Sequence, residues 1–375
     1  MRNLSKEDLE NYIIGSGILG CGGGGGASMD TIEDAFKKGL KFQLAEISEL
    51  PKDKYLCILA GVGGGVSKED RERVAAYSQK VERTREARTQ NLRKIAKELA
   101  DYIGVKEFYA YIATETGPGN GVTPMYLNAV EGKPCVDGDC CGRAKPEMGL
   151  SLTNVAGIPV TPMAMLTPFG EVVILKSALD DYRAEDITRH VAVASGGSVT
   201  VARCPAKVEQ YEKGIVPGQV TRCMKIGAAI RKAREKGDDP VEAFQKEAKA
   251  YRLFEGKVSS FEMEGRGGFD WGDWNIDGAG KFRGRKLRVW YKNENLVSWL
   301  DGKPYAMCPD LICIVDSKTC EGLSNFTQSG THNGKNVTVF GISAHERWRT
   351  PKGIEVFGPK HFGLDIEYAP VEKVI

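Results

Sequence analysis

The fold class is indicated most clearly by residues 55–70, YLCILAGVGGGVSKED. Residues 55–60 are apolar enough to form a buried strand, and glycines follow at Gly61, Gly63, Gly64 and Gly65. Ser67 and Asp70 then have the spacing of a helix capping box. A strand, a glycine turn and a helix in this order are typical of α/β proteins. We therefore predict an α/β fold.

A nucleotide site is the first function that such a unit suggests, and the glycine spacing argues against it. The turn at residues 61–65 does not fit GxGxxG, and the chain has no GxxxxGK[ST] phosphate loop. A literal GxGxxG does occur at residues 15–20, but it follows a predicted helix over residues 6–16 rather than a strand. A nicotinamide- or flavin-dependent oxidoreductase is the least favoured function.

The length of the chain favours two domains, because 375 residues exceed what one hydrophobic core usually organises. The fold class that we predict is α/β, with an N-terminal α/β domain that carries glycine-rich loops and the site, followed by a smaller β-rich C-terminal domain. We place the division at residue 178, giving domains 1–178 and 179–375. The second begins with helices, including one over residues 219–235, and short strands with glycine turns dominate after Tyr251.

Charge and composition exclude several classes of protein. A net charge of +2 gives no reason to expect nucleic acid or a membrane surface as the partner. No run of about 18 apolar residues is present that would span a membrane. Ten cysteines in a chain this long, with no signal peptide pattern, are expected to stay reduced. We expect a cytoplasmic protein.

The second glycine-rich loop, CGGGGG at residues 21–26, is a candidate for ligand binding. It lies between the first predicted helix and a second one that Ser28 or Asp30 can cap. Free backbone N–H groups of Gly22, Gly23, Gly24, Gly25 and Gly26 would suit a carboxylate or phosphate. A flexible turn is the alternative. Cys21, at the edge of this loop, is the most plausible reactive thiol of the ten.

Glu115 is a candidate because it follows the predicted strand over residues 108–113. In open α/β sheets ligands bind beyond the carboxyl ends of the strands, and Asn120 follows within the same TETGPGNG segment. A structural role, in which Glu115 only caps the next helix, is equally compatible with the spacing.

CVDGDCCGRAKPEM, residues 135–148, holds the densest group of candidate residues. Asp137 and Asp139 follow a short strand and can act as a general base and its partner, or as oxygen ligands of a divalent metal. Arg143 can clasp a substrate carboxylate or pair with Glu147. The adjacent cysteines Cys140 and Cys141 lack the CxxC spacing of a zinc site.

Several strings together resemble one family, named for S-methyl thiohydantoin desulfurase and formerly a domain of unknown function. They are GCGGGGG, VDGDCCGRAKPE, NENLV, PDLI, WRTPKG and GPKHFGLDIEYAPV, in order along nearly the whole chain. Asp137, Asp139, Arg143 and Glu147 fall on the family pattern D-x-D-x-x-G-R-A-x-P-E, and Glu115 matches its earlier acidic residue. The chain departs from the family at Cys21, where threonine is expected, and in the paired cysteines.

The resemblance implies a hydrolase that acts on a five-membered thiohydantoin-like or hydantoin-like ring and releases a thiol from C2. In this hypothesis Asp137 or Asp139 activates water. Arg143 and the glycine N–H groups hold an acidic side chain or the developing anion. Glu115 and Glu147 orient the base in this hypothesis. Alternatively, they complete the ligand shell of a divalent metal. A non-catalytic subunit of a hydantoinase- or oxoprolinase-type enzyme is the other function considered, and we expect a homo-oligomer.

Overall fold

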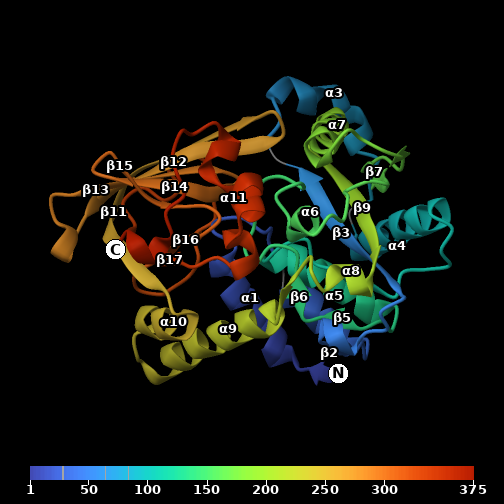
Figure 1. Cartoon of the computed structure of the whole chain (residues 1–375), viewed down its shortest axis with the longest axis horizontal. Coiled ribbons are helices and arrows are strands. Elements are labelled where there is room, and N and C mark those ends of the chain that lie inside the picture. The colour runs from blue at the N-terminus through green and yellow to red at the C-terminus, as the bar shows by residue number, and fades with distance from the viewer. Residues whose placement is uncertain (28, 64, 83) are drawn as a thin grey trace.

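The fold was analysed in a computed structural model, which describes residues 1–27, 29–63, 65–82 and 84–375. Ser28 and Gly64, named above, lie outside the described residues. The chain forms an α/β part that holds the N-terminus and a β-rich part that holds the C-terminus, with helices α9 (Gln219–Lys236) and α10 (Pro240–Ala248) along one side of both (Figure 1). The expected mixed α/β architecture is confirmed.

A five-stranded mixed sheet forms the centre of the α/β part, in the order β4-β3-β9-β7-β8. Strand β3 (Tyr55–Gly63) pairs in parallel with the edge strand β4 (Ala110–Ile112) and antiparallel with the central strand β9 (Ser198–Lys207). The strands β7 (Met163–Leu166) and β8 (Val172–Leu175) complete the sheet. Because β9 follows residue 178, this sheet takes strands from both sides of the predicted domain division. The division into domains 1–178 and 179–375 stays a prediction.

Helices cover both faces of this sheet. On one face α4 (Arg85–Tyr102) buries Ile95 and Leu99 against Cys57 and Leu59 of β3. On the other face α7 (Asp181–Ala194) buries Ala184 and Ala192 among apolar residues of β3 and β9. With both faces buried, β3 reads as a nearly continuous apolar run, as the sequence suggested.

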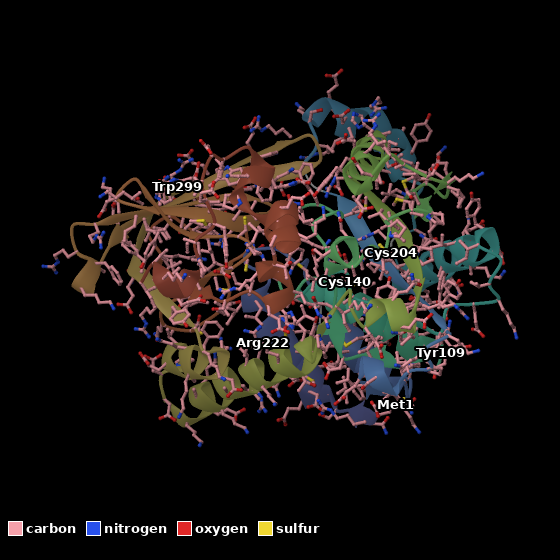
Figure 2. The ribbon with its side chains drawn as sticks, viewed as in Figure 1. Met1, Tyr109, Cys140, Cys204, Arg222 and Trp299 are labelled. Carbon is pink, nitrogen blue, oxygen red and sulfur yellow. The ribbon has the colours of Figure 1, made fainter. Side chains whose placement is uncertain are left out.

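A seven-stranded antiparallel sheet forms the β-rich part, in the order β15-β14-β13-β12-β11-β17-β16. Its strands in chain order are β11 (Tyr251–Arg266), β12 (Phe269–Gly278), β13 (Lys286–Lys292), β14 (Glu294–Leu300), β15 (Lys303–Met307), β16 (Leu311–Asp316) and β17 (Asn336–Ile342). Figure 2 shows Trp299 of β14 on this sheet, and Cys140 and Cys204 in the α/β part. The predicted β-rich character after Tyr251 is confirmed.

Helix α1 (Lys6–Leu19) joins the two parts by packing along α9. A capping box begins this helix, since the Ser5 side chain accepts from the N–H of Asp8 and the Asp8 side chain from the N–H of Ser5. A Cβ added at Gly15 would overlap the carbonyl of Cys223 on α9. The literal GxGxxG therefore begins inside a helix, where its first glycine lets two helices approach closely.

The remaining elements are short. They comprise strands β1 (Arg2–Leu4), β2 (Phe42–Ala45), β5 (Cys135–Val136), β6 (Gly138–Asp139) and β10 (Val216–Pro217), and helices α2 (Met29–Lys37), α3 (Lys68–Ser78), α5 (Pro118–Val130), α6 (Leu152–Val155), α8 (Val208–Tyr211) and α11 (Pro351–Phe357). Within the described ranges, no helix is long and apolar enough to cross a membrane.

Candidate active site

A cavity of about 210 Å³ lies between the α/β part and the seven-stranded sheet. The α/β part contributes the ends of strands β3 and β4, the turn after residue 144 and the glycine loop, and the β-rich part contributes the turn between β13 and β14. The lining residues are Gly24, Gly25, Ala60, Gly61, Val62, Gly63, Thr114, Glu115, Asn120, Lys145, Pro146, Glu147, Met148, Arg189, Arg203, Asn293, Glu294 and Phe326. Both parts of the chain therefore build this site.

Glu115 and Asn120, two of the residues proposed from the sequence, lie together in this cavity. Glu115 Oε1 accepts a hydrogen bond from Asn120 Nδ2 at 2.6 Å, and Oε2 accepts from the backbone N–H of Lys145 at 3.0 Å. Burial raises the pKa of the Glu115 carboxyl, and the charge of Lys145 opposes that rise. The contacts to Asn120 and Lys145 favour the ionised form, so Glu115 is placed to accept a proton.

Glu294, the first residue of β14, brings a second carboxyl group to the cavity. The residue is 2% exposed, and Oε2 has no hydrogen-bond partner among the described residues. Burial raises its pKa well above the ordinary value, and the negative charge of Glu115 raises it further. This environment favours the protonated form of Glu294, which can donate a proton. The sequence analysis missed this residue, although NENLV was among the strings that carried the family resemblance.

The glycine loop makes room for these groups. A Cβ added at Gly23 would overlap Oε1 of Glu294, and a Cβ added at Gly22 would overlap the Asn325 side chain. The carbonyl oxygen of Gly24 accepts from the N–H groups of Gly119 and Asn120, at 3.1 and 3.0 Å. The loop thus caps the N-terminus of α5 with its own carbonyl, and Gly24 and Gly25 line the cavity.

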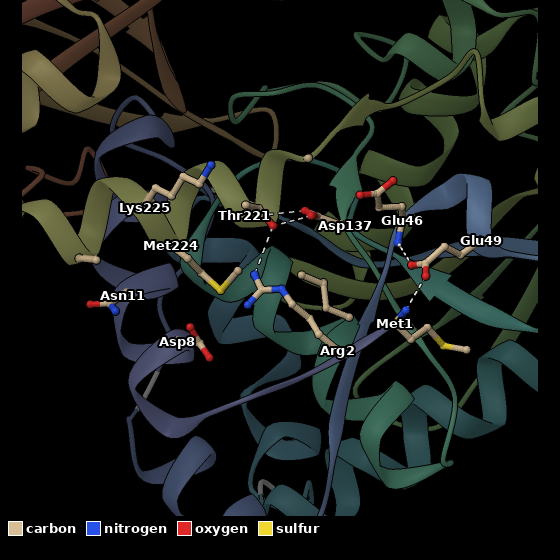
Figure 3. Close-up of a pocket in the computed structure, with 13 residues that line it drawn as sticks. Met1, Arg2, Asp8, Asn11, Glu46, Glu49, Asp137, Thr221, Met224 and Lys225 are labelled. Atoms are coloured by element: carbon tan, nitrogen blue, oxygen red, sulfur yellow. Dashed lines mark hydrogen bonds and ion pairs between the residues drawn. The ribbon is translucent and has the colours of Figure 1, made fainter.

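Asp137 is not among the residues that line the small cavity. Its Oδ1 accepts from the N–H of Thr221 at 2.9 Å and its Oδ2 from the Thr221 hydroxyl at 2.5 Å. Asp137 lines a second, more open cavity of about 860 Å³ near the N-terminus, where Thr221 also contacts Arg2 (Figure 3). Although this second cavity is larger, it holds neither Glu115 nor Glu294 among its lining residues.

Asp139 is buried beneath the small cavity and does not line it. Its Oδ1 accepts from the N–H groups of Cys141 and Gly142, at 2.8 and 2.5 Å, and its Oδ2 accepts from the Thr116 hydroxyl at 2.5 Å. Burial raises the pKa of this carboxyl, against these hydrogen bonds. Both oxygens are occupied, so the contacts of Asp139 hold the turn at residues 139–142 in shape.

Arg143 holds the two parts of the chain together. Its buried guanidinium donates to the backbone carbonyls of Ala144, Asn295 and Asp310, at 3.0, 2.6 and 2.7 Å. The sequence left open a pairing of Arg143 with Glu147, and this pairing is wrong. Glu147 instead forms ion pairs with Lys292 and with His361, the latter at 2.9 Å.

Glu147 lines the cavity as an ionised group. Burial would raise its pKa, but the hydrogen bond to His361 and the charge of Lys292 together lower the pKa to about 2. Because Lys292 and His361 both belong to the β-rich part, this carboxylate links that part to the turn that carries Lys145. We infer a positioning role for Glu147.

All ten cysteines are buried and free of disulfide bonds, in line with the expectation that they stay reduced. Cys21 Sγ lies 4.0 Å from Cys313 Sγ. Burial alone would raise the Cys21 pKa, but the contact with Cys313 and the charge of Arg143 lower it to about 7. Cys21 is not among the residues that line the cavity, and burial raises the pKa of both Cys140 and Cys141.

A divalent metal does not fit the carboxylates that the sequence proposed as its ligands. Those of Asp137 and Asp139 have both oxygens occupied by donors of the protein, and that of Glu147 is bound by Lys292 and by the His361 ring. Within the described residues no three His, Cys, Asp or Glu side chains are grouped to hold a metal ion. No step below uses a metal.

The fold and the cavity define a two-part α/β protein whose interior site is built around a pair of carboxyl groups. Family models described as S-Me-THD-like, N-terminal domain and S-Me-THD-like, C-terminal domain match residues 7–177 and 179–371. The chain belongs to this S-Me-THD-like family.

The comparison with solved structures supports the fold. An X-ray crystal structure of a protein from Chromobacterium violaceum, from a structural genomics consortium, is similar to this chain with a TM-score of 0.74 and 20% identity. The match covers 99% of this chain and 100% of the other. At that identity the similarity concerns the fold alone. The comparison with curated proteins found no match.

Proposed function

We propose that the protein is a hydrolase that releases a thiol from C2 of an S-alkylated thiohydantoin ring, leaving a hydantoin. Membership of the S-Me-THD-like family supports the class of substrate. The observation that carries the reaction type is the pair Glu115 and Glu294 in one small cavity. Burial raises the pKa of both carboxyls, but hydrogen bonds from Asn120 and Lys145 oppose the rise only at Glu115, so we assign Glu115 as the general base and Glu294 as the general acid.

In the first step of this mechanism a water oxygen bonds to C2 of the ring. Glu115 takes a proton from the water, and Glu294 gives its proton to the ring nitrogen that gains the electron pair of the C2–N double bond. This assignment moves the base, expected at Asp137 or Asp139, to Glu115, because neither aspartate lines the cavity.

In the second step the C2–S bond breaks and the C2–O double bond forms. The hydroxyl proton returns to Glu294, and the proton on Glu115 goes to the leaving thiolate. The products are a thiol and a hydantoin, and both carboxyl groups return to their starting protonation states. Asn120 orients Glu115 through the hydrogen bond to Oε1. Arg143 donates its hydrogen bonds to backbone carbonyls of the protein and does not line the cavity, so we assign it no contact with the substrate.

The test is thiol release from S-methyl thiohydantoin by the purified protein and by the variant Glu294→Gln. Loss of a general acid lowers kcat by roughly 10²- to 10⁴-fold. We expect a loss of that size with an unchanged melting temperature, because glutamine has the same shape and the Glu294 Oε2 has no partner to lose.

The matched control is Asp137→Asn, which changes a carboxylate outside the cavity and should keep the wild-type rate. Equal loss in both variants would remove Glu294 from the mechanism. If the wild type turns over no thiohydantoin but co-purifies with a hydantoinase-type enzyme, the accessory-subunit alternative is favoured.

A further inference from the structure

Arg203 is a buried cation of the cavity that lacks an acidic partner. It lies on β9, is 1% exposed and lines the cavity. Nη2 donates to the Thr114 hydroxyl at 2.6 Å, and Nη1 contacts Cys204 Sγ at 3.3 Å. Nε is buried and has no hydrogen-bond partner among the described residues. A guanidinium offers five N–H donors, so this one keeps donors free.

The other cationic side chains that line the cavity have their donors bound by groups of the protein. Arg189 pairs with Glu185, and Glu147 pairs with Lys292 and His361. Lys145 Nζ donates to the backbone carbonyls of Glu147 and Met148, at 3.2 and 3.3 Å. Burial and the charge of Glu115 raise the pKa of Glu294, which favours its uncharged form. Among the cationic side chains that line the cavity, Arg203 alone leaves a buried N–H without a hydrogen-bond partner in the described residues.

No carboxylate of the described residues lies within 4.0 Å of the Arg203 guanidinium. Asp181 is near enough for its pKa to be lowered by the Arg203 charge, against a larger rise from burial. The Asp181 carboxylate, however, accepts from the N–H of Val160 at 2.9 Å and forms no ion pair with Arg203. An unpaired buried charge is costly, and such groups usually gain a partner from a ligand or ordered water.

We propose that Arg203 is the anion-binding group of the cavity, and that the ring compound bound there presents a negatively charged oxygen to it. The proposal rests on the proposed function for the identity of the ring, but not for the anion site. Two chemical sources give the same contact, namely an ionised ring imide, whose charge is shared with its carbonyl oxygens, and a carboxylate substituent on the ring. This role was expected for Arg143, whose donors are instead used within the protein.

Small carboxylates test the anion site without any assumption about the ring. Acetate and formate should raise the melting temperature of the wild type above that in sodium chloride of equal ionic strength. Arg203→Gln should lose this rise, while Arg183→Gln, a change of an exposed arginine on α7, should keep it. No acetate-specific rise in the wild type, or an equal rise in Arg203→Gln, would overturn the proposal.

Ring compounds distinguish the two sources of charge, with dissociation constants measured by calorimetry. Hydantoin-5-acetic acid is compared with its amide, and hydantoin with N3-methylhydantoin, which cannot lose the imide proton. Arg203→Gln should weaken the charged member of the responsible pair by roughly tenfold or more and its neutral member by less than about twofold. Equal weakening of charged and neutral members overturns the proposal. Anion binding without thiohydantoin turnover would contradict only the proposed function.

The melting temperature distinguishes an arginine that binds a ligand from one that stabilises the fold. Since Arg203 has no acidic partner, Arg203→Gln should melt at or above the wild-type temperature. Arg189→Gln removes an arginine that is paired with Glu185 and donates to three backbone carbonyls, and it should melt lower. A similar fall in melting temperature in both variants would mean that Arg203 stabilises the fold, and this result would contradict a role in binding a ligand.

Discussion

Two acidic regions of this molecule look alike in sequence and differ in what surrounds their carboxyl groups. In the turn at residues 137–143, Asp137 and Asp139 have both oxygens occupied by donors of the protein. In the cavity, Glu294 has a buried oxygen without a partner. Hydrogen bonds that are complete stabilise a fold, whereas a buried group left incomplete has capacity for a ligand or a proton. We therefore assign a stabilising role to Asp137 and Asp139 in the turn and a role in the reaction to Glu294 in the cavity.

Asp139→Asn gives the largest stability loss that this comparison predicts. Asparagine keeps one acceptor oxygen and turns an amide toward donors, so at least one buried donor loses its partner. We expect a loss of about 2–4 kcal/mol in the free energy of unfolding, measured with urea. The turnover per folded molecule should stay within a few-fold of wild type. A stable but inactive variant would return Asp139 to the reaction.

The carboxylate of Glu147 also stabilises the fold, and we expect its contribution to depend on pH. Its pKa is about 2 in the folded protein against an ordinary value of 4.5, so its contribution is complete above about pH 4.5 and is lost as the pH falls toward 2. That contribution is roughly 3 kcal/mol at most, by the linkage between pKa and stability.

The measurement is urea unfolding of wild type and Glu147→Gln at pH 6 and at pH 2.5. The stability difference between the two proteins should shrink at the lower pH. A difference that stays constant with pH would mean that the ion pairs of Glu147 with Lys292 and His361 contribute little.

Asp137→Asn should have the smallest effect of the series. The Asp137 carboxylate accepts from the first turn of α9, and loss of such a capping contact costs about 1 kcal/mol. Thermal unfolding measures this loss, and thiol release should be unchanged. A strong loss of turnover would place the reaction in the open cavity of Figure 3 instead.

Much of the fold could be predicted from local sequence. The apolar run at residues 55–60 predicted β3, and the capping residue Ser67 predicted the start of α3. The helix expected over residues 219–235 is α9 (Gln219–Lys236). These features depend on neighbours within a few residues. The spacing of apolar residues and the capping residues are therefore enough to predict these helices and strands.

The site was predicted only in part, because its members come from distant segments. Glu115 and Asn120 follow a strand end, and that position predicted their place. Glu294 lies in a polar turn whose burial depends on contacts with the glycine loop far away in sequence. Asp137 and Asp139 look equivalent until the partners Thr221 and Thr116 are known. Arg203 lies in a strand, where sequence alone does not reveal an unpaired charge.

The protonation state of Glu294 at neutral pH tests the proposed general acid most directly. Infrared difference spectra between wild type and Glu294→Gln at pH 7 would report the C=O stretch of a protonated carboxyl group. We expect this band in wild type at pH 7 and not in the variant, because burial raises the pKa of Glu294. A carboxylate signal for Glu294 that appears with a midpoint below pH 5 would contradict it.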